Sequence, residues 1–159
     1  LKTEVKHGIF IPLFWKLVGY VRGEFGYINI LGKDDNRSVP LYDRFFLGGI
    51  NSLRGFKWAT VGPQENGYDI GGLTYGLGTV EVLFPVVESI GMRGVVFVDA
   101  GNAFRTMKDF RIGDFRTDAG CGIRWQSPLG PLRVEWGYNL DPEPGESKYQ
   151  FQFSAGAFF

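Results

Sequence analysis

An arginine in an apolar loop segment is the side chain in this sequence best suited to specific polar chemistry. Arg54 lies in "FLGGINSLRGF", residues 46–56, together with two phenylalanines, two leucines and an isoleucine. The surrounding region is too rich in glycine, proline and charge to form a strand. A guanidinium carries a permanent charge and five N–H donors, so burying it requires acceptor groups. The segment therefore favours a loop tip that does not face water.

Two acidic residues could supply those acceptors. Glu81 and Asp99 are each a lone acid between apolar neighbours, in "VEV" and "VDA". Successive side chains of a strand point to opposite faces, so if the apolar neighbours face lipid, both carboxylates face the interior on adjacent strands. Each pairing with Arg54 would have roughly 4 kcal/mol of Coulomb attraction at about 4 Å, and about 1–3 kcal/mol net. The residues alone leave open that Arg54 is a surface charge and that both acids are solvated.

The elements that would position these residues are strands with one apolar and one polar face. The alternation has period two and is clearest in the last third of the chain. Seven strands are predicted, over residues 2–11, 14–28, 73–86, 91–104, 115–125, 132–140 and 149–159. The clearest of them have close to the roughly 9–11 residues that a tilted strand needs to cross hydrocarbon. The sequence thus predicts an all-β chain of about seven to eight antiparallel strands.

The connections between these strands alternate between short and long. Outer-membrane barrels have this layout, with short turns at one end and long loops at the other. A soluble antiparallel sandwich or a lipocalin-like binding barrel also alternates apolar and polar residues, so the pattern alone leaves that class open. Large aromatic residues near the strand ends, on the apolar side, favour a membrane barrel. These aromatic residues are Trp125, Trp136, Tyr138, Tyr149 and Phe159.

The strand number and one long connection indicate a barrel larger than this chain alone could close. Single-chain bacterial barrels have even strand numbers, whereas seven is odd. An eight-stranded barrel is filled by its own side chains and has no room for a connection as long as residues 30–72. We therefore expect a C-terminal portion of a larger barrel, in which the loop 30–72 is extracellular or lies in the lumen.

Composition argues against several function classes. Seventeen basic and seventeen acidic residues cancel, which gives no indication of nucleic-acid binding. No apolar run reaches the roughly 20 residues of a membrane-spanning helix. His7 is the only histidine and Cys121 the only cysteine, and neither lies in a motif that would form a nucleophilic or metal site. We expect no enzymatic activity, no cofactor and no metal.

Several motifs, in order, resemble those of a known family. They are "FFLGGINSLRGF", "VGP", "VEVLFP", "VFVDAGNAF", "GIRWQSPLGPLRVEWG" and the final "FQFSAGAFF". Together they are similar to the C-terminal barrel half of the BamA family of outer-membrane assembly insertases, across nearly the whole chain. The resemblance implies that residues 1–159 are one C-terminal segment of a sixteen-stranded transmembrane β-barrel. The POTRA domains and the N-terminal barrel strands of that family have no counterpart here.

The resemblance also implies a function, a location and partners. The family assembles and inserts β-barrel proteins in the outer membrane of Gram-negative bacteria without making or breaking covalent bonds. The expected partners are outer-membrane lipid, unfolded outer-membrane protein clients and the lipoproteins of the assembly complex, with no nucleic acid. The alternative is a polypeptide-translocating or secretion pore of the same superfamily, and a soluble β-barrel binding protein is less favoured.

Two groups of residues receive roles from the same resemblance. In the family, the loop arginine is held inside the barrel by acidic partners, which assigns Glu81 and Asp99 as the lumen partners of Arg54. The rest of the loop motif is Gly48, Gly49, Gly55 and Phe56. The final strand matches the family's recognition strand, with a bend at a glycine. Its residues are Tyr149, Phe151, Phe153, Gly156 and Phe159.

Overall fold

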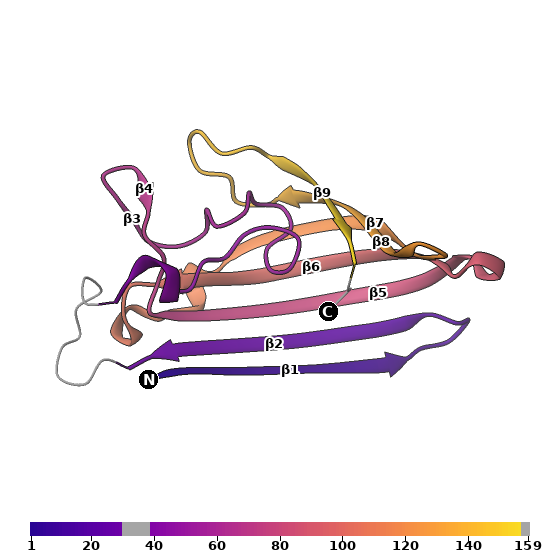
Figure 1. Ribbon diagram of the computed structural model, residues 1–159, viewed down its shortest axis with the longest axis horizontal. Coiled ribbons are helices and arrows are strands. Elements are labelled where there is room, and N and C mark those ends of the chain that lie inside the picture. The colour runs from indigo at the N-terminus through magenta and orange to yellow at the C-terminus, as the bar shows by residue number, and fades with distance from the viewer. Residues whose placement is uncertain (30–38, 157–159) are drawn as a thin grey trace.

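The computed structural model describes residues 1–29 and 39–156, which form one large antiparallel sheet and a small hairpin (Figure 1). The large sheet has seven strands, as predicted, in the order β1-β2-β5-β6-β7-β8-β9. Their bounds are β1 Lys2–Pro12, β2 Val18–Ile28, β5 Thr74–Val87, β6 Met92–Phe104, β7 Arg116–Ser127, β8 Gly130–Asn139 and β9 Tyr149–Ala155. The hairpin pairs β3 (Gln64–Glu65) with β4 (Tyr68–Asp69).

Within residues 1–29 and 39–156, helical structure is limited to single 3-10 turns in the connections. They are η2 Leu41–Asp43, η3 Glu88–Ile90, η4 Met107–Asp109 and η5 Ile112–Asp114. Among the described residues, no helix has the length and apolar character that crossing a membrane requires.

Two predicted strand ends differ from the structure by more than two residues. The second strand begins at Val18 rather than at residue 14, because Trp15 and Lys16 adopt left-handed backbone angles, with φ of 54° and 63°. These angles reverse the chain, and the turn is closed by a hydrogen bond from the Leu13 N–H to the Leu17 carbonyl, at 2.8 Å. The last strand ends at Ala155, and residues 157–159 lie outside the described part.

The antiparallel order places the short turns at one end of the sheet and the long connections at the other (Figure 1). The short turns join β1 to β2, β5 to β6 and β7 to β8. The long connections join β2 to β5, β6 to β7 and β8 to β9. This is the layout predicted from the alternating connection lengths.

The two faces of the sheet differ in polarity as the alternation predicted. Apolar side chains that are between 44% and 69% exposed cover the outer face, among them Val80, Val96, Val98, Ile123, Trp136, Phe151 and Phe153. Acidic side chains of the opposite face are buried, among them Glu81, Asp99 and Glu135. A soluble barrel would bury the apolar set and expose the acids, so the structure contradicts that interpretation.

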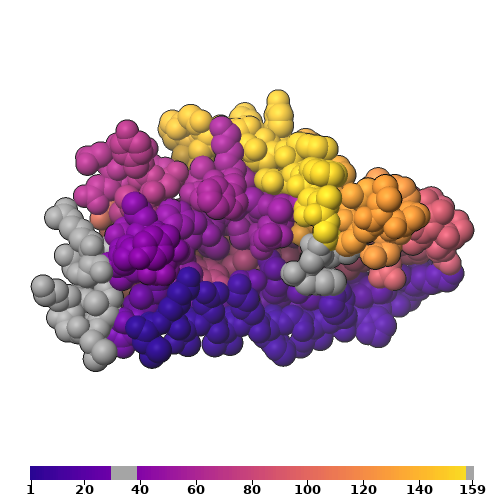
Figure 2. Space-filling model, in the orientation of Figure 1, coloured from indigo at the N-terminus to yellow at the C-terminus, as the bar shows by residue number. Residues whose placement is uncertain are grey.

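The described part of the β2–β5 connection, residues 39–73, covers the inner face of the sheet, and residues 30–38 of the predicted loop lie outside the described residues. Its apolar residues Phe45, Leu47, Leu53, Phe56 and Val61 form one buried cluster with side chains of β2, β5 and β6. Figure 2 shows residues of this connection, in purple, packed between the first two strands, in indigo, and the C-terminal region, in yellow. The sheet itself is open, because β1 and β9 are its two edges and do not pair with each other.

Candidate functional site

The tip of the long connection is a compact turn built on two glycines. Gly48 and Gly49 have φ of 106° and 97°, a region that residues with a Cβ rarely adopt. A Cβ on Gly48 would also collide with the carbonyl oxygen of Lys57. The Gly49 N–H donates to the carbonyls of Leu53 and Phe56, at 3.0 and 3.2 Å. These contacts fix the turn that presents Arg54.

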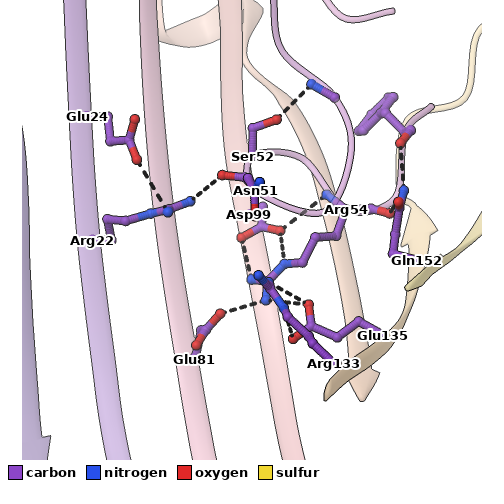
Figure 3. Close-up of polar contacts among 12 residues, drawn as sticks. Arg22, Glu24, Asn51, Ser52, Arg54, Glu81, Asp99, Arg133, Glu135 and Gln152 are labelled. Carbon is purple, nitrogen blue, oxygen red and sulfur yellow. Dashed lines mark hydrogen bonds and ion pairs between the residues drawn. The ribbon is translucent and has the colours of Figure 1, made fainter. Parts of the chain in front are cut away.

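Arg54 projects from this tip into a group of three carboxylates (Figure 3). Its Nε and Nη2 donate to the two oxygens of Asp99 on β6, both at 2.7 Å. Its Nη1 donates to Glu81 Oε1 on β5 at 2.6 Å and to Glu135 Oε2 on β8 at 3.1 Å. The structure therefore brings Arg54 together with the two acids selected from the sequence and with a third.

The guanidinium of Arg54 is almost completely removed from solvent. Only 2% of the side chain is exposed, and its Cζ lies 3.4 Å from the ring centroid of Phe97. Burial alone disfavours the charged form, but the hydrogen bond with Asp99 and the three negative charges outweigh it and raise the pKa of Arg54 above its ordinary value. Arg54 thus stays charged, held by ion pairs and by a cation–π contact.

Two further arginines complete the charge balance of the site. Arg124 on β7 donates to both oxygens of Glu81, at 2.8 and 2.9 Å, and through Nε to Glu135 at 2.9 Å. Arg133 on β8 donates to both oxygens of Glu135, at 2.7 and 2.8 Å. Glu81 and Glu135 therefore each accept hydrogen bonds from more than one arginine, which offsets the cost of burying their charges.

Glycines allow the loop backbone to lie directly on the sheet. A Cβ on Gly137 of β8 would come within 2.6 Å of the Arg54 carbonyl group, and a Cβ on Gly55 would come within 2.5 Å of the Asp118 Cβ. Gly55 therefore has a packing role in the loop motif, since any side chain there would push the tip away from β7 and β8.

Phe56 and the last strand hold the other side of the tip. Phe56 is 2% exposed and belongs to the buried apolar cluster. Arg116 on β7 places its Cζ 5.0 Å from the centroid of the Phe56 ring. Gln152 on β9 donates through Nε2 to the carbonyls of Arg54 and Phe56, at 3.3 and 3.2 Å.

Sequence reasoning missed Glu135, Arg124, Arg133 and Gln152. Glu135 carries the same signal as Glu81 and Asp99, because it is a lone acid between apolar residues, in "VEW". The arginines and Gln152 lie on the polar side of their strands, where many polar residues are solvated, so alternation alone does not single them out.

The predicted recognition strand is only partly described. Tyr149, Phe151 and Phe153 are exposed on the outer face of β9. Gly156 follows the strand with φ of 120°, a conformation suited to glycine, and its N–H donates to the Pro131 carbonyl at 2.9 Å. Phe159 lies outside the described residues.

An apolar outer face, a polar inner face and a loop docked on that inner face are together the features of a transmembrane β-barrel protein. The chain belongs to the Omp85 superfamily, since the family described as "Omp85 superfamily domain" matches residues 1–159.

Proteins similar to this chain include the outer membrane protein assembly factor BamA of Nitratidesulfovibrio vulgaris, 34% identical over 126 residues. That match covers 76% of this chain and 16% of the relative. BamA of Neisseria meningitidis serogroup B is 28% identical over 182 residues, covering 94% of this chain and 23% of the relative. The chain thus spans less than a quarter of either protein. These bacterial relatives indicate a location in the bacterial outer membrane.

A solved structure has the same fold. The crystal structure of BamA from Haemophilus ducreyi lacking POTRA domains 1–3 aligns with a TM-score of 0.77 and 28% sequence identity. The alignment covers 96% of this chain and 34% of that one.

Proposed function

We propose that this chain is part of the barrel of an outer-membrane protein assembly factor, which helps other β-barrel proteins to fold and insert. The observation that carries the proposal is the docked tip of the β2–β5 connection, with Arg54 buried against Glu81, Asp99 and Glu135. It is supported by membership of the Omp85 superfamily and by the names of the bacterial relatives.

The proposed activity is non-covalent. The outer face offers apolar side chains to lipid, and β9 is an edge strand of the described sheet. Edge strands present unpaired N–H and C=O groups, so an unfolded client could add a strand there. The expected partners are unfolded outer-membrane proteins, the surrounding lipid and the lipoproteins of an assembly complex. No step requires a nucleophile, a metal or a cofactor.

Replacing Arg54 tests whether the docked tip serves this function. In the full-length protein, Arg54→Ala leaves three buried acids with one cation fewer, so the tip should leave the inner face while the barrel still folds. We expect assembly of a heat-modifiable client barrel in cells to fall at least about tenfold, as the loss of a buried, charge-assisted contact implies. Lys57→Ala is the matched control, because it removes an exposed cation from the same loop.

The same variants separate assembly from transport. Purified wild-type protein in lipid vesicles should accelerate client folding, and Arg54→Ala should not. Normal client assembly by Arg54→Ala, with the barrel correctly folded, would contradict the role of the tip. Steady ion conductance with the tip docked, and no acceleration of client folding, would instead establish a pore.

A further inference from the structure

The last strand contacts the loop tip through one side chain. Gln152 lies on the inner face of β9, and its Nε2 donates to the carbonyl of Arg54 at 3.3 Å and to that of Phe56 at 3.2 Å (Figure 3). An amide nitrogen carries two N–H groups, so one side chain can serve both acceptors. Among the described residues, no other side chain of β9 forms a hydrogen bond with the β2–β5 connection.

The position of Gln152 in the sheet places this contact next to the buried arginine. Gln152 is the cross-strand neighbour of Glu135, and Glu135 accepts from the Arg54 guanidinium. Adjacent strands therefore hold Arg54 at two points, β8 through the side chain and β9 through the backbone carbonyl. Close contact between Gly137 and the tip allows the backbone to come within reach of Gln152.

Within the described sheet, β9 has fewer strand neighbours than an inner strand. In the described sheet it pairs on one side only, with β8. Its outer side chains, Tyr149, Phe151 and Phe153, are exposed and pack little against the rest of the chain. Hydrogen bonds from its inner face to the loop are thus a large part of what holds it beyond the β8 ladder.

We propose that Gln152 is a positioning residue that couples the docked loop tip to the last strand. When the tip is docked, its two carbonyls hold Gln152 and keep β9 on the sheet. When the tip leaves, β9 loses both hydrogen bonds and opens more readily. Coupling of this kind is reciprocal, so opening of β9 also loosens the tip. The inference goes beyond the proposed function, because it concerns two segments of the chain and holds whatever polypeptide the protein handles.

Hydrogen exchange tests this coupling in the full-length protein purified in detergent. Gln152→Met keeps the length of the side chain and removes its donors, and Gln152→Glu keeps the shape but offers only acceptors to two carbonyls. For both variants we expect amide exchange in residues 149–155 and 50–57 to rise about tenfold, as the loss of two hydrogen bonds implies. Gln150→Met is the matched control, because Gln150 lies on the same side of β9 and, within the part of the chain that the structure describes, forms no hydrogen bond with the tip. It should leave exchange unchanged.

A double-mutant comparison distinguishes coupling from simple loss of packing. Arg54→Lys should raise exchange in β9 when Gln152 is present and add little in the Gln152→Met background, because the contact that transmits the change is already gone. Equal effects of Arg54→Lys in both backgrounds would overturn the proposal, and so would unchanged β9 exchange in Gln152→Met. Neither readout depends on client assembly, so the proposed function can fail while the coupling stands.

Discussion

Arg54 and its apolar neighbours hold the loop tip by different means. Leu53 and Phe56 are 0% and 2% exposed, and burying side chains of this kind contributes about 1.5–3 kcal/mol each. The ion pairs of Arg54 contribute less than their short distances suggest, because desolvation of four charged groups opposes the Coulomb attraction. Apolar burial therefore supplies much of the docking energy, while the guanidinium determines the one place on the sheet where the tip can dock.

Substitution by asparagine should change the stability of the protein differently at two neighbouring buried aspartates. Asp99 and Asp118 are cross-strand neighbours and both are 0% exposed, but only Asp99 forms an ion pair with Arg54. Asp99→Asn replaces a bidentate carboxylate by an amide and should destabilise the protein by about 3 kcal/mol. Asp118→Asn removes a buried carboxyl group that forms no ion pair with Arg54, and should be neutral or stabilising. Urea unfolding in detergent micelles measures both.

The comparison between the two aspartates contains its own control, since the substitution is the same and the sites are adjacent. A loss of stability in Asp118→Asn as large as that in Asp99→Asn would show that the ion pair with Arg54 is not what distinguishes them.

At the scale of elements, the β8–β9 connection is tied to the sheet by Arg116 at the start of β7. Its Nη2 donates to the Asp141 carbonyl and to Glu146 Oε2, both at 2.6 Å, and its Nη1 lies 3.1 Å from Glu143 Oε1. The same guanidinium lies over the Phe56 ring. Arg116 thus links this connection to the docked tip.

The link between Arg116 and Glu146 predicts a pH dependence. Burial raises the pKa of Glu146, but the hydrogen bond from Arg116 and that from the Glu143 N–H outweigh it, so the pKa lies below its ordinary value of 4.5. A carboxyl whose pKa is lower in the folded than in the unfolded state stabilises the fold at pH values above its unfolded-state pKa. That contribution is lost as the pH falls through the folded-state pKa. We expect protease cleavage within residues 140–148 to accelerate as pH falls below 4.5.

Arg116→Gln provides the control for that titration. Without the cation, cleavage of the β8–β9 connection should already be fast near neutral pH and should change little on acidification. An acid-dependent increase that persists unchanged in Arg116→Gln would exclude Glu146 and Arg116 as its cause.

The strands were predictable because side chains of a strand alternate between two environments. That alternation located seven strands and assigned Glu81 and Asp99 to the buried face. It failed at residues 14–17, where Trp15 and Lys16 adopt left-handed backbone angles that neither residue type favours. A turn of this kind has no glycine or asparagine to indicate it, so the pattern extended the strand too far.

At the scale of the whole molecule, the site depends on which strands the docked tip can reach at once. Arg54 contacts acids on β5, β6 and β8, although β5 and β8 are separated by two strands in the sheet. Alternation predicts that these acids share a face, but it contains no information on how far apart strands that are not neighbours lie. Glu135 therefore carries the same local signal as Glu81 and becomes a partner of Arg54 only through the three-dimensional arrangement of the sheet.

The exposed apolar face gives the last prediction, which concerns the molecule as a body in lipid. Val98, in the middle of β6, is 49% exposed on the outer face. If that face contacts hydrocarbon, Val98→Arg places a charge near the centre of the bilayer and should reduce folding stability in lipid vesicles by about 2–4 kcal/mol. Ile112→Arg is the matched control, because Ile112 is 74% exposed but lies in η5, outside the strands.

The control should fold into vesicles with nearly unchanged stability, since its position is expected to lie beyond the hydrocarbon. In detergent-free urea both variants are unfolded. The difference between their folding stabilities therefore reports only on the folded state in lipid. Equal stabilities of Val98→Arg and Ile112→Arg would mean that the outer face does not contact hydrocarbon. The inner face would then not be the interior of a membrane barrel. A partner that covers the sheet would have to account for the burial of Arg54.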